Sequence, residues 1–454
     1  MAAKRMVPGD PARDAEFDAA FDLLTRTVDF KQADVIHPVR GNAVYTSGVV
    51  LWMLVYQRMN PDTSLEAAVK KLLDAKPSFL PANKRVTEGT LSSNTSTYSQ
   101  ARSRLPLDAV RWFAGQVSGS LIDATEPTFE GRRLFLIDGT TITLAPEDEL
   151  RREFPPATNQ HGESVFPVAL LVVAHEMASG AALIPEVGAM YGPNAVSETA
   201  LVRNTLHRLP TNSIAMADSG FGIFVVAHEA SVAGHSFLLR MTKQRFDALR
   251  KKAEPVEQGD GFKSWSLAWR PSRDERKKHP DLPSDAVLNV RLHEVVINEN
   301  LTLPLVSDLP NEAQVMAALY KRRYDIEVDI RNLKIVLDTE NIRARSVDTF
   351  HKELLASFVS YNLVSQFRRQ AAKLAGQTPR RMSFKRTWTT FRTFLLSNMF
   401  TDAAQWRERY RIALGYAQLD KLPNRPGRTY AREVYKRRQK SDSFKARKRK
   451  PPPD

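Results

Sequence analysis

The chain has 454 residues, of which 42% are hydrophobic, and its formal net charge is +15. The hydrophobic content suffices for a globular core, and the charge favours a polyanionic partner such as nucleic acid. The absence of cysteine excludes disulfides, thiolate catalysis and cysteine-based zinc sites, and it fits a reducing cytosol. No apolar run approaches the ~20 residues needed to cross a bilayer. We therefore expect a cytoplasmic protein without a membrane partner.

Residues 1–118 are predicted to form a helical domain. Apolar residues recur there at spacings of three and four, which is the pattern of amphipathic helices. The segments with this pattern are Ala15–Val28, Thr46–Met59 and Ser64–Leu73.

From residue 119 onward, short β-rich runs replace the helical pattern, and strands and helices then alternate. This order predicts an α/β fold with a mixed sheet, whose first part we assign to residues 119–242. The predicted strands are Leu134–Ile137, Ile142–Leu144, Pro167–Ala174, Ala182–Gly188, Ser213–Ala217 and Ser236–Met241. The predicted helices are Ser197–Leu209 and Ile223–Ala233.

Residues 243–310 interrupt this alternation and are predicted to be a β-rich insertion. Its strand-like runs are Ser264–Trp269, Val287–Val296 and Leu301–Val306. A long helix, Asn311–Asp338, then dominates the final part of the core, residues 311–345. Residues 346–420 are predicted to be a C-terminal helical region, with helices at Ser346–Leu374 and Phe384–Ser397.

The tail, residues 421–454, carries 13 Lys or Arg and 3 Asp or Glu, so it holds +10 of the net charge of +15. With five prolines and few apolar residues, it cannot bury enough surface to fold alone. We predict a disordered basic tail that binds nucleic acid.

The helix Asn311–Asp338 carries a charged stripe beside its apolar face. At about 100° per residue, the stripe spans roughly 80°, and it comprises Tyr320, Arg323, Glu327, Arg331 and Lys334. A solvated helix face with i,i+4 pairs explains most such stripes. Here, however, one carboxylate lies among cations suited to phosphate contact.

Two more carboxylates are placed after apolar strands. Asp138 follows Leu134–Ile137 and precedes a glycine, and Asp218 follows Ser213–Ala217. Taken singly, an Asp-Gly hairpin turn and a helix N-cap are the simpler interpretations. Two carboxylates at strand ends of one sheet, where sites tend to gather, favour a functional role.

Three carboxylates suit two-metal phosphodiester chemistry. Two cations about 3.5–4 Å apart can activate a water or a 3′-hydroxyl and stabilise the leaving oxygen, and Mg²⁺ prefers such oxygen ligands. The nine histidines show no metal-ligand spacing, and no glycine-rich phosphate loop is present.

At these residues the sequence resembles a known family. The pattern Tyr320-x2-Arg323-x3-Glu327-x6-Lys334 matches the signature of cut-and-paste DDE transposases encoded by one large group of bacterial insertion sequences. The contexts Asp138-Gly-Thr-Thr and Ala-Asp218-Ser-Gly-Phe-Gly resemble that family's first two acidic motifs. The similarity extends from about Ser99 to about Leu414.

The resemblance implies a ribonuclease-H-like catalytic core with a β insertion, an N-terminal helical DNA-binding domain and a C-terminal helical region used in synapsis. Asp138, Asp218 and Glu327 would be the catalytic residues and would bind two Mg²⁺ ions, for which Mn²⁺ can substitute. Double-stranded DNA, as transposon terminal inverted repeats and target, would be the partner of a homodimer at the bacterial nucleoid.

The DNA-contacting residues implied by the resemblance are chiefly cations. They are Tyr320, Arg323 and Lys334, with Arg331 on the same stripe and Arg240 at the end of a strand. Relatives that excise through a DNA hairpin can hold a flipped base with a tryptophan on the strand before the signature helix. Here Leu301–Val306 has none, and Trp265 and Trp269 in the insertion could substitute by stacking.

Two other functions fit the same fold. A domesticated DNA-binding protein would keep the fold without cutting, but all three carboxylates are retained, which favours an enzyme. A structure-specific nuclease would lack strand transfer, and the helical domain and basic tail favour recognition of transposon ends instead.

Overall fold

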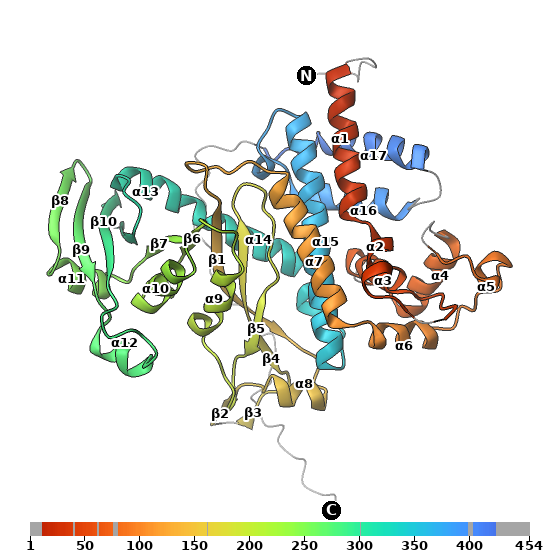
Figure 1. The fold of residues 1–454 in the computed structure, drawn as a ribbon, viewed down its shortest axis with the longest axis horizontal. Coiled ribbons are helices and arrows are strands. Elements are labelled where there is room, and N and C mark those ends of the chain that lie inside the picture. The colour runs from red at the N-terminus through yellow and green to blue at the C-terminus, as the bar shows by residue number, and fades with distance from the viewer. Residues whose placement is uncertain are drawn as a thin grey trace, which may run out of the picture.

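The structure is a computed structural model with a mixed sheet at its centre and helices on both sides (Figure 1). It describes residues 11–39, 41–60, 63–75, 80–160, 162–299, 301–397 and 403–423. The basic tail that we predict over residues 421–454 therefore lies almost entirely outside the described residues. No helix in the described ranges combines the length and the apolar character needed to span a membrane.

Helices fill the N-terminal region, as the periodicity predicts. They are α1 (Pro11–Thr27), α2 (Phe30–Ile36), α3 (Ser47–Met59), α4 (Leu65–Ala75), α5 (Lys84–Thr87), α6 (Ser96–Arg104) and α7 (Leu107–Asp123). The hydroxyl of Thr46 caps α3 by accepting from the Val49 amide. A Cβ at Gly48 would lie 2.2 Å from the Phe30 carbonyl oxygen, so glycine is what lets α2 and α3 approach closely.

The central sheet has nine strands in the order β5-β4-β1-β6-β7-β11-β10-β9-β8. Its first five strands in chain order are β1 (Leu134–Thr143), β4 (Val168–Glu176), β5 (Glu186–Ala189), β6 (Ile214–Ala217) and β7 (Ser236–Arg240). The strands β1, β6 and β7 are mutually parallel, whereas β4 and β5 pair antiparallel. The α/β class with a mixed sheet is thus confirmed. A separate two-residue hairpin pairs β2 (Thr158–Asn159) with β3 (Gly162–Glu163).

The predicted turn at Asp138 is wrong, because β1 runs on through it. Asp138 and Gly139 pair with Val173 and Val172 of β4, so the two short strands expected here are one. The run Thr140–Thr143 is rich in β-branched residues, which favour a pleated strand and outweigh the turn preference of Asp-Gly. Asp138 therefore lies within a strand, at the position where pairing with β6 has just ended.

The insertion continues the same sheet. Its strands β8 (Glu254–Gly259), β9 (Phe262–Trp269), β10 (Leu288–Asn298) and β11 (Leu301–Ser307) are accompanied by α11 (Lys243–Arg250) and α12 (Arg273–Lys278). β11 pairs antiparallel with β7, which joins the two parts (Figure 1). The outermost strand, β8, is broken by an irregularity between Pro255 and Glu257. The segment is β-rich as predicted, and it is continuous with the core.

Helices cover both faces of the sheet. Because successive strand residues point to opposite faces, Phe135 and Ile137 of β1 pack with α9 (Glu198–His207) and α10 (Phe224–Val232). Leu134 and Leu136 pack on the other face with α7 and with α15 (Val347–Leu374). A short helix, α8 (Asp148–Glu153), follows β1.

The predicted helix Asn311–Asp338 is present but irregular. It comprises α13 (Ala313–Tyr320), a 3-10 turn at Lys321–Arg323, α14 (Tyr324–Arg331) and a π-turn at Asn332–Val336. The expected apolar face is confirmed, since Ile326, Leu333 and Leu337 are buried. The expectation of one regular helix is wrong.

The 28-residue helix α15 lies between the sheet and the N-terminal helices and packs against α3 and α7 (Figure 1). Ser346 and Thr349 form a capping box at its start. The described C-terminal helices that follow are α16 (Phe384–Ser397) and α17 (Ala403–Ala417). The C-terminal helices predicted from the sequence are thus confirmed.

A buried ion pair ties α14 to the segment after α15. Asp329 is fully buried and accepts two hydrogen bonds of 2.6 Å each from the guanidinium of Arg380. Burial alone would raise the pKa of Asp329, but Arg380 and His175 more than offset it, so the pKa is lowered. The bidentate geometry compensates the buried charge.

We predict that Arg380→Ala destabilises the protein by about 3–5 kcal/mol, because it leaves the Asp329 carboxylate buried without its partner. Urea unfolding measures the loss. The matched control is Arg381→Ala, which removes the same charge from an exposed neighbour. An Arg380→Ala protein within about 1 kcal/mol of that control would contradict the assigned role.

Candidate active site

The register of β1 and β6 places two of the predicted carboxylates side by side. Ile137 is the partner of Ala217 in this parallel pair, and Asp138 and Asp218 are the next residue of each strand. Asp138 accepts from the Gly139 amide at 2.9 Å, and Asp218 accepts from the Gly220 amide at 2.8 Å. Each carboxylate is thereby held at the point where the pairing between β1 and β6 ends.

The turn after Asp218 packs tightly on the end of β7. A Cβ at Gly222 would lie 2.0 Å from the carbonyl oxygen of Arg240, a backbone atom that cannot move aside cheaply. Gly222 of the Asp218 motif is therefore required by the structure, because only glycine lets this turn approach the backbone of the neighbouring strand so closely.

The third carboxylate, Glu327 of α14, is connected to this site by ion pairs of Arg323. Arg323 pairs with Glu327 four residues later, and its other guanidinium nitrogen lies 3.5 Å from Oδ2 of Asp138. The side chain of Arg323 is 17% exposed, so these charges meet in a poorly solvated place. Arg323 thus bridges the carboxylates of the strand and of the helix.

A fourth carboxylate, Glu198, lies at the same place and was not predicted from the sequence. It is the first residue of α9, on the opposite face of the sheet from α14. A Cβ at Gly139 would lie 2.0 Å from Oε1 of Glu198, so the missing side chain is what lets this carboxylate rest against β1 beside Asp138. An acidic residue in the first helical turn is common for reasons of the helix dipole, so its sequence position carries no functional signal.

The carboxylates raise one another's proton affinity. Burial raises the pKa of Asp138 to about 6, and the charge of Asp218 adds to the increase, while Arg323 opposes it. Burial and then Asp218 raise the pKa of Glu198 as well. Such shifts, caused by burial and like charges at one place, are typical of sites that receive a cation or a proton.

The donor chemistry suits a hard divalent cation. The side chains around β1 and β6 offer carboxylate oxygens, which are the ligands that Mg²⁺ prefers. Within the described residues, however, no three His, Asp or Glu groups are arranged as ligands of one metal ion. Among the described residues of the site, Arg323 is the positive group that bridges the carboxylates.

Tyr320 and Arg240 line the buried side of this region. Tyr320 is only 6% exposed, which differs from its expected place on an exposed stripe. Burial raises its pKa, and the charges of Arg323 and Arg240 oppose that increase, so all three side chains are close. The Tyr320 hydroxyl and Nε of Arg240 have no hydrogen-bond partner among the described residues.

Lys334 and Arg331 occupy different surroundings. Lys334 donates to the carbonyl of Thr141 in β1 at 3.0 Å and pairs with Glu340 at 3.1 Å. It is therefore bound to its own protein in the turn that follows α14, instead of standing free on an exposed helix face as expected. Arg331 is exposed and makes no ion pair with any described residue.

The two insertion tryptophans belong to the packing of the protein. Trp269 is 3% exposed and meets the ring of Phe224 edge-on, with the ring centroids 5.4 Å apart. Trp265 is half-buried, packs on Phe246 and lies under the guanidinium of Arg250. The alternative that these residues stack on a DNA base is not favoured, least of all for Trp269, because a core position leaves no ring face free.

Because the pKa of Asp138 is raised in the folded state, ionisation of this carboxyl lowers the stability of the metal-free protein. Because the folded carboxyl has the higher pKa, stability falls as pH rises from about 4 to about 6. We expect Asp138→Asn to match wild type near pH 4 and to exceed its stability by about 1–3 kcal/mol above pH 6. Urea unfolding in chelator across this range measures the difference.

Asp108→Asn, at an exposed position of α7, is the control for loss of one carboxylate. A constant difference between Asp138→Asn and wild type from pH 4 to pH 7 would show that the folded site does not hold Asp138 in a charge-disfavouring environment.

Comparison with known proteins supports a functional assignment. No curated protein sequence matches the chain. A solved structure, the cryo-EM structure of the piggyBac transposase synaptic complex with hairpin DNA, aligns with 91% of this chain and 86% of its own at 11% identity. The TM-score is 0.39, which is too low to support an argument. Residues 129–363, more than half of the chain, match the transposase DDE domain family. They contain both strand-end aspartates, Glu198, the insertion and α14, so this chain belongs to the transposase DDE domain family.

Proposed function

We propose that this protein is an active cut-and-paste transposase that cleaves DNA at transposon ends and joins them to target DNA. The observation that carries the proposal is the parallel register of β1 and β6, which places Asp138 beside Asp218, with Glu327 linked to Asp138 through Arg323. Family membership makes DNA transposition the expected use of such a site.

The proposed core is ribonuclease-H-like. Five strands in the order β5-β4-β1-β6-β7, of which only β4 runs in the opposite direction, support this assignment together with helices on both faces. We further propose that residues 1–118 bind the transposon ends, that residues 346–420 act in synapsis, and that a homodimer at the bacterial nucleoid is the working unit.

Asp138, Asp218 and Glu327 would hold two Mg²⁺ ions, which supply Lewis-acid stabilisation of the attacking and leaving oxygens. The protein's own contribution is to bind and orient the DNA strand. Arg323 and Arg240 lie beside the carboxylates and can contact phosphate oxygens. The unpartnered hydroxyl of Tyr320 can donate to the same strand. Phosphates bound to Arg323 would compete with Glu327 for the guanidinium, and the Glu327 carboxylate would then be free to act as a ligand.

We propose that Glu198 is a fourth acidic residue of this site, acting from the face of the sheet opposite α14. Its carboxylate lies against Gly139 and interacts with the charges of Asp218 and Asp138. From this place it would orient a metal-bound water or a ligand from the side that Asp138 and Glu327 do not cover. The proposed reaction does not include excision through a DNA hairpin, because Trp269 is buried in the core and has no ring face free to hold a flipped base.

We predict that Asp138→Asn, Asp218→Asn or Glu327→Gln lowers cleavage by roughly a thousandfold or more, as expected when a group acting in the transition state is removed. Binding to the same DNA should persist. The measurement is release of the element from a plasmid that carries the gene with its flanking DNA, alongside fluorescence anisotropy for binding.

The control is Asp325→Asn, an acidic neighbour on α14 that pairs with Arg322 at 2.8 Å. It should cleave within a few-fold of wild type. If a variant of the triad kept the wild-type rate in Mg²⁺, that residue would not be a metal ligand, and if all three did, the proposed activity would be wrong.

For Glu198→Gln we expect divalent-metal affinity to fall about 10–100-fold, the range for residues that orient metal ligands. Isothermal calorimetry with Mn²⁺ reports this without any DNA. Gly139→Ala should act in the same direction, because its Cβ displaces the Glu198 carboxylate. Glu66→Gln, at an exposed position of α4, is the control. Unchanged Mn²⁺ binding in both site variants would remove Glu198 from the metal site.

A further inference from the structure

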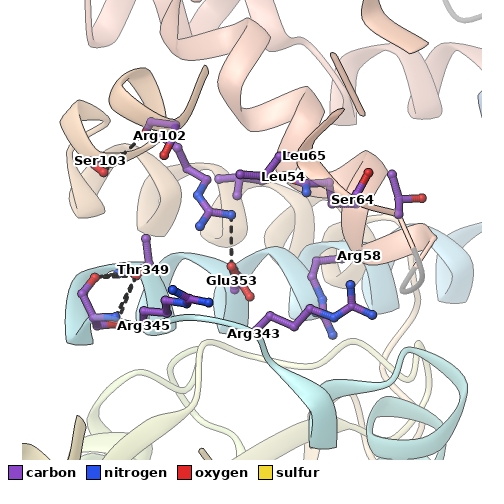
Figure 2. A pocket seen from close by; sticks show the side chains of 14 residues that line it. Leu54, Arg58, Ser64, Leu65, Arg102, Ser103, Arg343, Arg345, Thr349 and Glu353 are labelled. Atoms are coloured by element: carbon purple, nitrogen blue, oxygen red, sulfur yellow. Dashed lines mark hydrogen bonds and ion pairs between the residues drawn. The ribbon is translucent and has the colours of Figure 1, made fainter. Parts of the chain in front are cut away.

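A cavity of about 570 Å³ separates the N-terminal helices from the start of α15. Figure 2 shows side chains from α3, α4 and α6 on one side of it, and those of the segment around residues 343–353 on the other. No role in the proposed chemistry has been assigned to it. Its position, between two regions far apart in the sequence, makes it a candidate binding site.

The charged residues that line the cavity are mainly arginines. Arg58, Arg102, Arg343 and Arg345 contribute four positive charges, and Glu353 contributes the one negative charge. Arg102 pairs with Glu353 at 3.1 Å (Figure 2), so these two charges offset each other. Arg345 pairs with Glu147 at 3.6 Å. The guanidinium groups of Arg58 and Arg343 remain without an ion pair among the described residues, and a small cavity with this excess is suited to an anion.

Arg58 is a buried cation with an unsatisfied donor. The residue is 7% exposed, and its guanidinium donates to the carbonyls of Leu337 and Asp338 at 3.0 and 2.9 Å. Its Nε has no hydrogen-bond partner among the described residues. Burial lowers its pKa, the charges of Glu353 and Asp338 oppose that decrease, and the charge of Arg343 adds to it. A buried donor without an acceptor is costly, so an acceptor supplied by a ligand would relieve the cost.

Arg343 faces the same space from the other side. It is exposed, and no ion pair joins it to any residue in the described part of the chain. Figure 2 shows its side chain running toward that of Arg58. An anion between these two like charges would reduce their mutual repulsion. The first amides of α15 are already bonded to Ser346 and Glu149, so the arginines must carry the binding.

The cavity adjoins a second one beside β1. Arg343 and Arg345 also line this larger cavity of about 1040 Å³, together with Lys334, Thr141 and the acidic residues Glu147, Asp338 and Glu340. Lys334 is bonded to Thr141 in β1, three residues after Asp138. Because Lys334 pairs with Glu340 and Arg345 pairs with Glu147, Arg58 and Arg343 are the lining cations without an ion pair among the described residues.

We propose that the cavity between Arg58 and Arg343 binds a backbone phosphate of the DNA whose end lies at Asp138 and Asp218. The proposal rests on the proposed function, since the DNA must reach those carboxylates. Charge complementarity favours a phosphate in this cavity. The neighbouring cavity, which shares Arg343 and borders Thr141 of β1, favours a phosphodiester over a free anion, because a strand leaving the site would pass that way.

The test is the salt dependence of DNA affinity for Arg343→Ala. One lost phosphate contact should reduce the slope of log affinity against log salt by about 0.9. The probe is a short fluorescein-labelled duplex from the DNA flanking the gene, and the readout is anisotropy. Arg273→Ala, which removes an exposed arginine from α12 in the insertion, should leave the slope unchanged. Arg343→Lys should retain most of the slope, because it keeps the charge.

A second measurement separates DNA from a free anion. Inorganic phosphate is added at constant ionic strength, and the thermal unfolding midpoint is followed in wild type and in Arg343→Ala. Phosphate stabilisation that is lost in the variant, with equal DNA slopes in both proteins, would identify a free-anion site and overturn the proposal. Equal DNA slopes without phosphate stabilisation would overturn it too. If wild type binds DNA in either case, the proposed transposase function survives, whereas absence of any DNA binding contradicts that function itself.

Discussion

Negative charge is concentrated where β1 and β6 stop pairing, and the guanidinium of Arg323 lies among the carboxylates. Asp138 and Asp218 are adjacent because the strands are parallel and in register, and burial raises the pKa of Asp138 to about 6. Without a cation, such a group would tend to take up protons. The other features of the site follow from this concentration of negative charge. Arg323 supplies positive charge at this point, and the fourth carboxylate, Glu198 beside Gly139, adds to the need for it.

The helix that carries Glu327 is anchored on its opposite, buried face. Glu327 is exposed, while Asp329, two residues later and about 200° around the helix, is fully buried against Arg380. One face of α14 is therefore fixed to the C-terminal region, and the other carries the carboxylate. Lys334, bonded to β1 in the following turn, provides a second attachment. Glu327 can separate from Arg323 by a side-chain movement without any shift of the helix.

Much of this arrangement follows from the sequence, and the exceptions have physical causes. Hydrophobic spacing predicts the helices and strands, since burial of one face is a local pattern. The break between two short strands at Asp138 was predicted wrongly, because local turn preference gave no weight to the β-branched residues after it or to the partner strand β4. A single sequence does not show that Gly139 faces a carboxylate, so Glu198 was missed. The burial of Tyr320 and Trp269 likewise depends on elements distant in the chain.

The continuous sheet has only two edge strands in the described structure, β5 and β8, and neither is suited to pairing with a strand of another molecule. β5 is packed against α9, and β8 combines Pro255 with an irregular register and the charges of Glu254 and Glu257. Proline, bulges and charge are the devices by which proteins prevent edge-to-edge aggregation. Copies of this protein gathered on one DNA molecule can therefore reach high local concentration without polymerising through their sheets. Any specific self-association must use helical or loop surfaces instead.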